Sequence, residues 1–339
     1  MSKTALPTNL MQAIRYFSDP DVCVQFVASL RWGDGKPVCP ECGGMDHSFL
    51  TTRRLWKCKA CKKQFSVKVG TIFEDSPLGL DKWLCAIWLI ANSKNGISSH
   101  ELGRSIGVTQ KSAWFMLHRI RLAMQTGSFD KFDGIVEVDE TFIGGLARNM
   151  HKSKRPKGTG FVGKTIVAGA LNRGGQVTAA VIPNTRTATL TDFVEEVVEP
   201  GATVYTDALA SYRTLGRDYE HATIDHATHY VDGQVHTNGM ENFWSLLKRG
   251  LHGTYISVEA FHLFRYIDER VFTFNHREAT DLGRFSTVVE MAALAAAMAL
   301  AGVDPSGARR LRRCVMAMGL LQWVVPNRTT CWRRGPDHR

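Results

Sequence analysis

Two Cys-x-x-Cys pairs constrain the folding of this 339-residue chain more tightly than any other feature of its sequence. The pairs are Cys39 with Cys42 and Cys58 with Cys61. Two cysteines three positions apart in a tight turn can direct both thiolates at one ion, and Gly43-Gly44 permits such a turn. A segment this short buries too little apolar area to fold unaided, so a metal would supply much of its folding free energy. The spacing predicts a zinc ribbon at residues 37–69 with one structural zinc ion, and a pair of disulfides is the alternative.

The predicted ribbon carries basic side chains of the kind that contact nucleic-acid phosphates. They are Arg53, Arg54, Lys57, Lys59, Lys62 and Lys63. We expect Arg53 and Arg54 to contact DNA, and a solvated basic face is the alternative interpretation. Before the ribbon, residues 1–36 contain an amphipathic stretch that Pro20 interrupts, which favours two short helices over one long helix.

Residues 76–129 form a predicted helical domain whose second half has the helix-turn-helix layout. A helix from Ser98 to Ile106 leads to Gly107 at the turn, and a second helix runs from Thr109 to Met124. Residues near the start of such a second helix reach base edges in the major groove. The candidate DNA contacts are therefore Gln110, Lys111 and Ser112, and a plain helical hairpin is the alternative.

An acidic strand is predicted at residues 135–145, which read IVEVDETFIGG. Its apolar residues alternate with Glu137, Asp139 and Thr141, the period-two pattern of a strand with one apolar face. An acidic residue within such a stretch is disfavoured unless something nearby needs its charge. An edge strand that shows its polar residues to water is the alternative.

Two later stretches also place a carboxylate on a defined element. Residues 203–207 (TVYTD) predict a strand that ends on Asp207, before a segment expected to be helical. Residues 236–250 (HTNGMENFWSLLKRG) predict a turn at Asn238-Gly239 and an apolar helix that begins near Glu241. Helix capping is the alternative for both acids. Carboxylates that converge from separate elements could instead hold two hard divalent cations, and Lys248 would project from nearly the same helix face as Glu241.

The elements between these acids predict a mixed sheet with helices packed on it. Strands are expected at 164–171 and 176–182 around a hairpin turn, followed by a helix at 187–198. The basic segment at 148–160 is either a flexible hairpin tip or a grip on the DNA backbone. Its candidate DNA contacts are Lys154, Arg155 and Lys157.

Three segments, VEVDETFIGG, VYTDALASY and HTNGMENFWSLLKRGLHGTY, resemble the DDE-type insertion-sequence transposases of the zinc-ribbon-bearing ISXO-type group. The resemblance extends from Arg15 to Arg284. It implies an RNase H-like catalytic domain that cuts DNA at the terminal inverted repeats and joins the 3′-hydroxyls to target DNA. It also implies a homodimer or higher homo-oligomer on DNA.

The same resemblance matches Asp139, Asp207 and Glu241 to the acidic triad that holds two magnesium or manganese ions. It matches Lys248 to the basic companion of the triad, and Arg249 beside it is a further candidate DNA contact. Relatives in this group can carry Asn at the third acidic position, and Asn238 and Asn242 flank Glu241 here. We expect Glu241 to fill the position, because a carboxylate holds a divalent cation better than a neutral amide.

The expected fold class is α+β multidomain. Its parts are an N-terminal helical segment (1–36), a zinc ribbon (37–69), a helix-turn-helix domain (76–129), an RNase H-like α/β catalytic domain with a mixed sheet (133–284), and an Ala-rich helix with a basic tail (285–339). The net charge of +10 is weak support for DNA binding by the main body, because eight Arg and two Asp after residue 301 supply +6 of it.

No apolar run is long enough to span a bilayer and the first residues lack the layout of a signal peptide, so we expect a cytoplasmic protein without a membrane partner. Two alternatives to a transposase stay open. One is a DNA-binding regulator with a vestigial nuclease core, and the other is an RNase H-like nuclease without joining activity.

Overall fold

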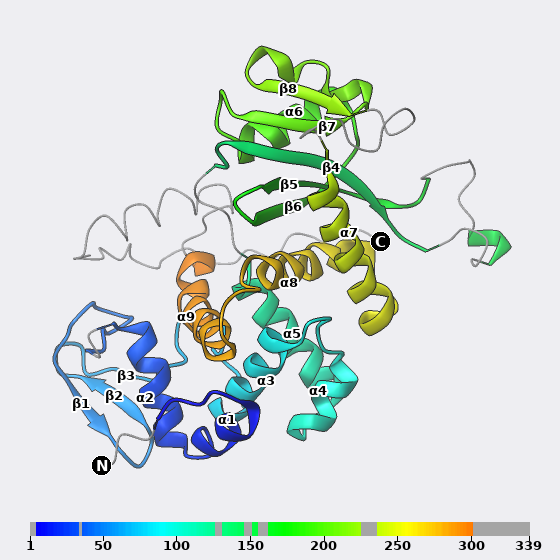
Figure 1. Ribbon diagram of the computed structural model, residues 1–339. Coiled ribbons are helices and arrows are strands. Elements are labelled where there is room, and N and C mark those ends of the chain that lie inside the picture. The colour runs from blue at the N-terminus through cyan, green and yellow to red at the C-terminus, as the bar shows by residue number, and fades with distance from the viewer. Residues whose placement is uncertain are drawn as a thin grey trace, which may run out of the picture.

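The computed structural model describes residues 5–33, 36–125, 131–145, 151–154, 162–224 and 236–300, without the side chains of Lys154 and residues 295–300. This part of the chain forms two lobes (Figure 1), one built on a five-stranded sheet and one of helices with a small three-stranded sheet. Helix α7 (Asn238–Gly250) runs from the large sheet toward the helices. No helix in these ranges is long and apolar enough to cross a membrane.

The small sheet is antiparallel, with the strand order β1-β2-β3. Its strands are β1 (His47–Leu50), β2 (Leu55–Cys58) and β3 (Gln64–Phe65). Two short helices precede it, α1 (Leu10–Tyr16) and α2 (Pro20–Arg31), as predicted from Pro20. Pro20 is the first residue of α2, where its missing N–H breaks no helical hydrogen bond.

Three helices follow the ribbon, and the second and third lie within one residue of their predicted bounds. They are α3 (Leu80–Asn92), α4 (Ser99–Ile106) and α5 (Gln110–Ala123). Gly107 ends α4 with φ of +64°, a conformation that glycine adopts without steric cost. Thr109 caps α5, because its Oγ1 accepts the N–H of Ser112 at 3.2 Å.

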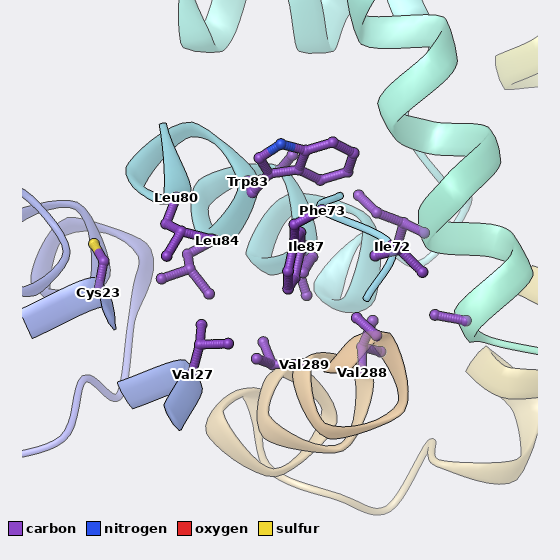
Figure 2. Close-up of a cluster of buried hydrophobic side chains, with 14 of the residues drawn as sticks. Cys23, Val27, Ile72, Phe73, Leu80, Trp83, Leu84, Ile87, Val288 and Val289 are labelled. Carbon is purple, nitrogen blue, oxygen red and sulfur yellow. The ribbon is translucent and has the colours of Figure 1, made fainter. Parts of the chain in front are cut away.

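Helix α9 (Asp281–Leu300) completes the core of this helical lobe, although it follows the large sheet in the sequence. Figure 2 shows Val288 and Val289 of α9 in one cluster with Val27 of α2 and with Leu84 and Ile87 of α3. The boundary expected between residues 284 and 285 falls within α9. The chain therefore returns to its N-terminal helices before the described residues end.

Helix α8 (Leu263–Asn275) lies between the two lobes and contributes to both cores. Ile267 packs with α7, whereas Phe272 belongs to the core of the helical lobe. Phe261 and Phe264 are 68% and 42% exposed, although both are aromatic. The buried positions at this end of α8 are those of Leu263 and Tyr266 instead.

A buried ion pair joins α8 to α5. Nε of Arg121 lies 2.7 Å from a carboxylate oxygen of Glu269, and neither side chain is more than 1% exposed. The other oxygen of Glu269 accepts the hydroxyl of Tyr255 at 2.6 Å. Breaking such a pair leaves an uncompensated buried charge, so these contacts resist separation of the two helices.

The large sheet is mixed, as predicted, with the strand order β6-β5-β4-β7-β8. Its strands are β4 (Ile135–Ile143), β5 (Thr165–Asn172), β6 (Gln176–Ile182), β7 (Thr203–Asp207) and β8 (Glu220–Ile224). Strands β4, β5 and β6 pair in antiparallel fashion, whereas β4, β7 and β8 run parallel. After Asp207 the chain forms two short 3-10 turns, Ala210–Tyr212 and Leu215–Arg217, in place of the expected helix.

Helices cover both faces of this sheet. Helix α6 (Thr187–Val197) packs on β5 and shares a hydrophobic core with Val136 and Val138 of β4, and α7 lies against the opposite face. The strand order places β4 between β5 and β7, so β4 is a central strand and not an edge strand. On the α7 side, Glu137 and Thr141 are only 1% and 5% exposed, so the polar face of β4 is buried as well.

Candidate active site

The register of two parallel strands brings Asp139 next to Asp207. Strand β4 pairs with β7 as far as Glu137 opposite Tyr205. Asp139 and Asp207 each lie two residues beyond that pair, and residues two apart in a strand share a face. Both carboxylates therefore project from neighbouring strands on the side of the sheet that α7 covers. Asp207 also accepts the N–H of Leu209 at 3.1 Å, so it caps the turn that follows it.

Asp139 lies in a crowded, negatively charged environment. Burial, followed by the charges of Asp207 and Glu241, raises the pKa of its carboxyl to about 6 against opposing hydrogen bonds. One of those bonds comes from the indole Nε1 of Trp244, which donates to Oδ2 of Asp139 at 3.0 Å. A group of carboxylates that repel one another in a partly dry site fits a divalent cation, whose charge would remove the repulsion.

Gly169 makes room for this arrangement. It lies directly opposite Asp139 on β5. A Cβ at this position would lie 2.7 Å from Cη2 of Trp244, closer than real Cβ contacts. The absent side chain therefore lets the indole lie across the strand and reach Asp139.

Helix α7 brings Glu241 to the same face. Glu241 is half-buried and within electrostatic reach of Asp139, whereas Asn242 is exposed. The predicted turn at Asn238-Gly239 is not formed, because both residues belong to the first turn of α7. The N-cap residue is Thr237, whose side chain makes no capping bond, so a capping box does not describe this helix start. Oδ1 of Asn238 is buried and has no hydrogen-bond partner in the described structure.

The basic candidates of α7 lie in its last turn, where Lys248 is half-buried and Arg249 is exposed.

Among the residues that the structure describes, the three acids are not drawn together as tightly as the four cysteines. Within the described ranges, the cysteines form the only group of three or more His, Cys, Asp or Glu whose ligand atoms lie within 4.8 Å of one another. Asp139, Asp207 and Glu241 thus share one surface without forming a closed cage.

Glu140 is a residue of this region that sequence reasoning missed. Its Oε2 accepts the hydroxyl of Tyr212 at 2.7 Å. Burial, together with the charges of Asp207 and Asp139, raises the pKa of Glu140 to about 7, while the hydrogen bond from Tyr212 opposes the rise. Two adjacent acids inside an apolar strand were the signal that could have identified it.

The four cysteines come together as predicted. Sγ of Cys39 lies 3.7 Å from Sγ of Cys61, and Sγ of Cys42 lies 3.6 Å from Sγ of Cys58. Four thiolates about 2.3 Å from a tetrahedral zinc ion would be about 3.8 Å apart, so the group fits one ion closely. A Cβ on Gly44 would lie 3.3 Å from Sγ of Cys58, which shows how closely the chain wraps this cluster.

Two segments of the chain match known protein families. Residues 131–275 match the ISXO2-like transposase domain, and residues 18–64 match the transposase zinc-ribbon domain. A transposase-like protein of Haemophilus influenzae is 35% identical over 104 residues, which cover 30% of this chain and 84% of the relative. The chain belongs to the ISXO2-like transposase family.

A second relative extends the likeness over more of this transposase. A protein of Halobacterium salinarum, named as an uncharacterized protein in transposable element ISH50, is 28% identical over 261 residues. The match covers 71% of this chain and 86% of the relative. The resemblance inferred from three short motifs is thereby confirmed.

The basic residues of the zinc ribbon are partly neutralised within the transposase. Arg54 pairs with Asp21 at 2.6 Å, Lys59 with Asp46 at 3.0 Å, and Lys63 with Glu41 at 2.7 Å. Arg53, Lys57 and Lys62 are exposed and form no ion pair within the described ranges. Arg53 is therefore better placed than Arg54 to contact a phosphate.

The other predicted DNA contacts differ in how available their side chains are. Gln110 donates to Ser99 Oγ at 2.9 Å, and Ser112 shares a hydrogen bond with Thr109 at 2.9 Å, whereas Lys111 is exposed. Lys154 ends the short 3-10 turn Lys152–Lys154. Arg155 and Lys157 lie outside the described residues.

Proposed function

We propose that this protein cuts DNA at the ends of its insertion sequence and joins the freed 3′-hydroxyls to target DNA. Membership of a transposase family supports the general reaction. The single observation that carries the proposal is the parallel register of β4 and β7, which sets Asp139 beside Asp207 under the helix that bears Glu241.

In this proposal Asp139, Asp207 and Glu241 hold two divalent cations, magnesium or manganese. When bound, such a pair activates the attacking hydroxyl and stabilises the leaving oxygen of a phosphodiester. The protein's own groups prepare the site. The indole of Trp244 holds one oxygen of Asp139, so the carboxylate has one fixed orientation. Lys248, two helical turns beyond Glu241, would contact a phosphate of the bound DNA.

We further propose that the sheet domain is RNase H-like and that the smaller modules recognise the terminal inverted repeats. Support for the first point is the order of three antiparallel strands, a helix and two parallel strands, with acids on the central strands. Support for the second is the tight turn between α4 and α5 and the exposed Lys111 at the start of α5. Joining two ends in one reaction requires at least a homodimer in this scheme.

A strand-transfer assay tests the proposal. The substrate is a plasmid that carries the ends of the element, with magnesium present and a second plasmid as target. We expect wild-type protein to give joined products and Asp139→Asn, Asp207→Asn and Glu241→Gln to lose at least about 100-fold, because cation contacts contribute several kcal/mol to the transition state. Asp192→Asn is the matched control, since Asp192 is exposed on α6 on the opposite face.

Each alternative predicts a different result in the same assay. Cut but unjoined DNA would indicate a nuclease without joining activity. Binding of the ends without any cutting, unchanged by Asp139→Asn, would indicate a regulator and contradict the proposal.

A further inference from the structure

Glu137 is a buried acid on the face of β4 that α7 covers. Its side chain is 2% exposed, so its charge must be compensated inside the protein. One oxygen, Oε1, lies 3.1 Å from Nε of Arg173 and 3.3 Å from Nδ1 of His236. The other oxygen, Oε2, accepts the backbone N–H of Met240 at 3.1 Å. Both oxygens are thus engaged by protein groups, which distinguishes Glu137 from a cation ligand.

The bond to Met240 replaces a missing cap on α7. The first N–H groups of a helix have no partner within the helix, and Thr237 supplies no side-chain bond to them. Glu137 provides the acceptor from a strand 103 residues earlier, and its negative charge is favourable at a helix N-terminus. Gly239 permits the close approach, because a Cβ there would lie 2.7 Å from Oε2 of Glu137.

The residues that compensate the charge of Glu137 are themselves held in place. Arg173 lies in the turn between β5 and β6, where its N–H donates to the carbonyl of Ile135 at 3.0 Å. Its guanidinium stacks over the ring of Tyr205 at 4.9 Å. Arg173 also donates to the carbonyl of His236 at 3.3 Å. Glu137 therefore joins β4, the β5–β6 turn and the segment that leads into α7.

A second hydrogen bond fixes α7 to the same strand. Trp244 donates to Asp139, four helix residues after Met240 and two strand residues after Glu137. Residues four apart on a helix share a face, and so do residues two apart on a strand. The two hydrogen bonds therefore join the same face of α7 to the same face of β4. Glu241 lies between the two attached helix residues. Two attachment points set both the register and the rotation of the helix, and with them the position of Glu241.

We propose that Glu137 is a positioning residue that anchors the start of α7 on β4 and so holds Glu241 beside Asp139 and Asp207. This inference rests on the proposed function, in which these three acids take up divalent cations. Loss of the anchor is expected to weaken cation uptake while the fold persists, because Trp244 and the apolar contacts of α7 remain.

The test measures Mn²⁺ binding by calorimetry on the full-length, zinc-loaded protein, together with thermal unfolding. Glu137→Gln keeps the shape of the side chain but removes the charge that pairs with Arg173. Glu195→Gln is the matched control, because it removes the same charge from an exposed position on α6. Asp139→Ala defines the signal of the cation site. Gly239→Ala is a second variant that keeps Glu137 and pushes the helix start away from it.

We expect wild-type protein and Glu195→Gln to bind Mn²⁺ equally and Asp139→Ala to lose that binding. Glu137→Gln and Gly239→Ala should each bind about 10- to 100-fold more weakly, the range seen when groups that orient metal ligands are removed, and still unfold cooperatively. If Glu137→Gln does not fold, Gly239→Ala decides the question alone. Wild-type affinity in both variants would overturn the inference and leave the proposed function standing. Absence of Mn²⁺ binding by the wild-type protein at the Asp139 site would overturn both.

Discussion

At the scale of single residues, a polar contact of the candidate site comes from a side chain that the apolar pattern of its helix assigns to the hydrophobic core. Trp244 lies in an apolar helix and is 4% exposed, yet its indole N–H is bound to Asp139. Tryptophan can fill apolar volume and orient a carboxylate at once, because its single donor lies at the edge of the ring. A buried Trp next to an acidic strand therefore has two roles that substitutions can separate.

Trp244→Phe should reduce strand transfer about 10- to 100-fold, because the ring volume is largely kept while the donor to Asp139 is lost. Unfolding by urea and the strand-transfer assay would measure the two effects separately. Trp88→Phe is the control, since Trp88 is buried in the helical lobe against Phe285. Equal activity losses in the two variants would show that the indole of Trp244 acts only as packing.

Gly169→Ala should both destabilise the protein, by about 1–3 kcal/mol, and reduce activity. The added methyl group would collide with Trp244 and displace α7 from β4. Gly216→Ala is the control, because a Cβ there meets nothing within 4 Å. If urea unfolding gives the same stability for both variants, the close approach at Gly169 is not required.

At the scale of elements, the zinc ribbon is a very short sheet next to a cluster of four cysteines. Its strands contain two to four residues each, too few for an independent hydrophobic core. Trp56 and Phe65 of the ribbon pack with Trp32, which follows α2, so the ribbon is joined to the helical lobe by aromatic contacts. A zinc ion held by the four cysteine thiolates would supply the stability that these few contacts cannot.

Cys58→Ser should abolish zinc binding and unfold the ribbon while leaving the large sheet intact. Metal analysis should find about one zinc per chain in the wild-type protein and little in the variant. Hydrogen exchange should show lost protection at residues 47–65 and retained protection in β4 and β5. Cys85→Ser is the control, since Cys85 is half-buried on α3 outside the cluster. Full zinc content in Cys58→Ser would contradict the assignment.

At the scale of the whole molecule, the helical lobe is built from two separate parts of the chain, because α9 follows the large sheet in the sequence but packs with the N-terminal helices. Phe285 of α9 packs against Phe17, which directly follows α1, and against Phe26 of α2 and Trp88 of α3. The DNA-binding modules proposed here are thus completed by a helix that follows the candidate catalytic residues. Together with the buried pair of Arg121 and Glu269, this packing couples the two lobes.

Phe285→Ala should lower the free energy of unfolding by about 3–5 kcal/mol, because it removes a fully buried ring from the core of the helical lobe. Leu294→Ala on the same helix is the control, since Leu294 is 44% exposed and should change stability by less than about 1 kcal/mol. Urea unfolding measures both. Similar values for the two variants would mean that α9 contributes little to the helical lobe.

Local patterns predicted the elements well, and they failed where a distant contact overrides them. The strands around Asn172–Gly175 and the caps at Ser98 and Thr109 follow from turn and capping chemistry that acts within a few residues. Asn238-Gly239 reads as a turn, but it begins α7 because Glu137 accepts the N–H of Met240. That acceptor is too far away in the sequence for any local pattern to reveal it.

The amino-acid pattern predicts the cysteine cluster, the mixed sheet and the candidate acids, because each prediction depends on spacing within one segment or on a motif. The folded structure is needed to show that Asp139 and Asp207 lie side by side, that Trp244 and Glu137 attach α7 to β4, and that α9 completes the N-terminal core. These contacts join residues from about 70 to more than 250 positions apart. Strand register and helix packing set them, and both depend on how whole elements fit together rather than on the pattern within any one of them.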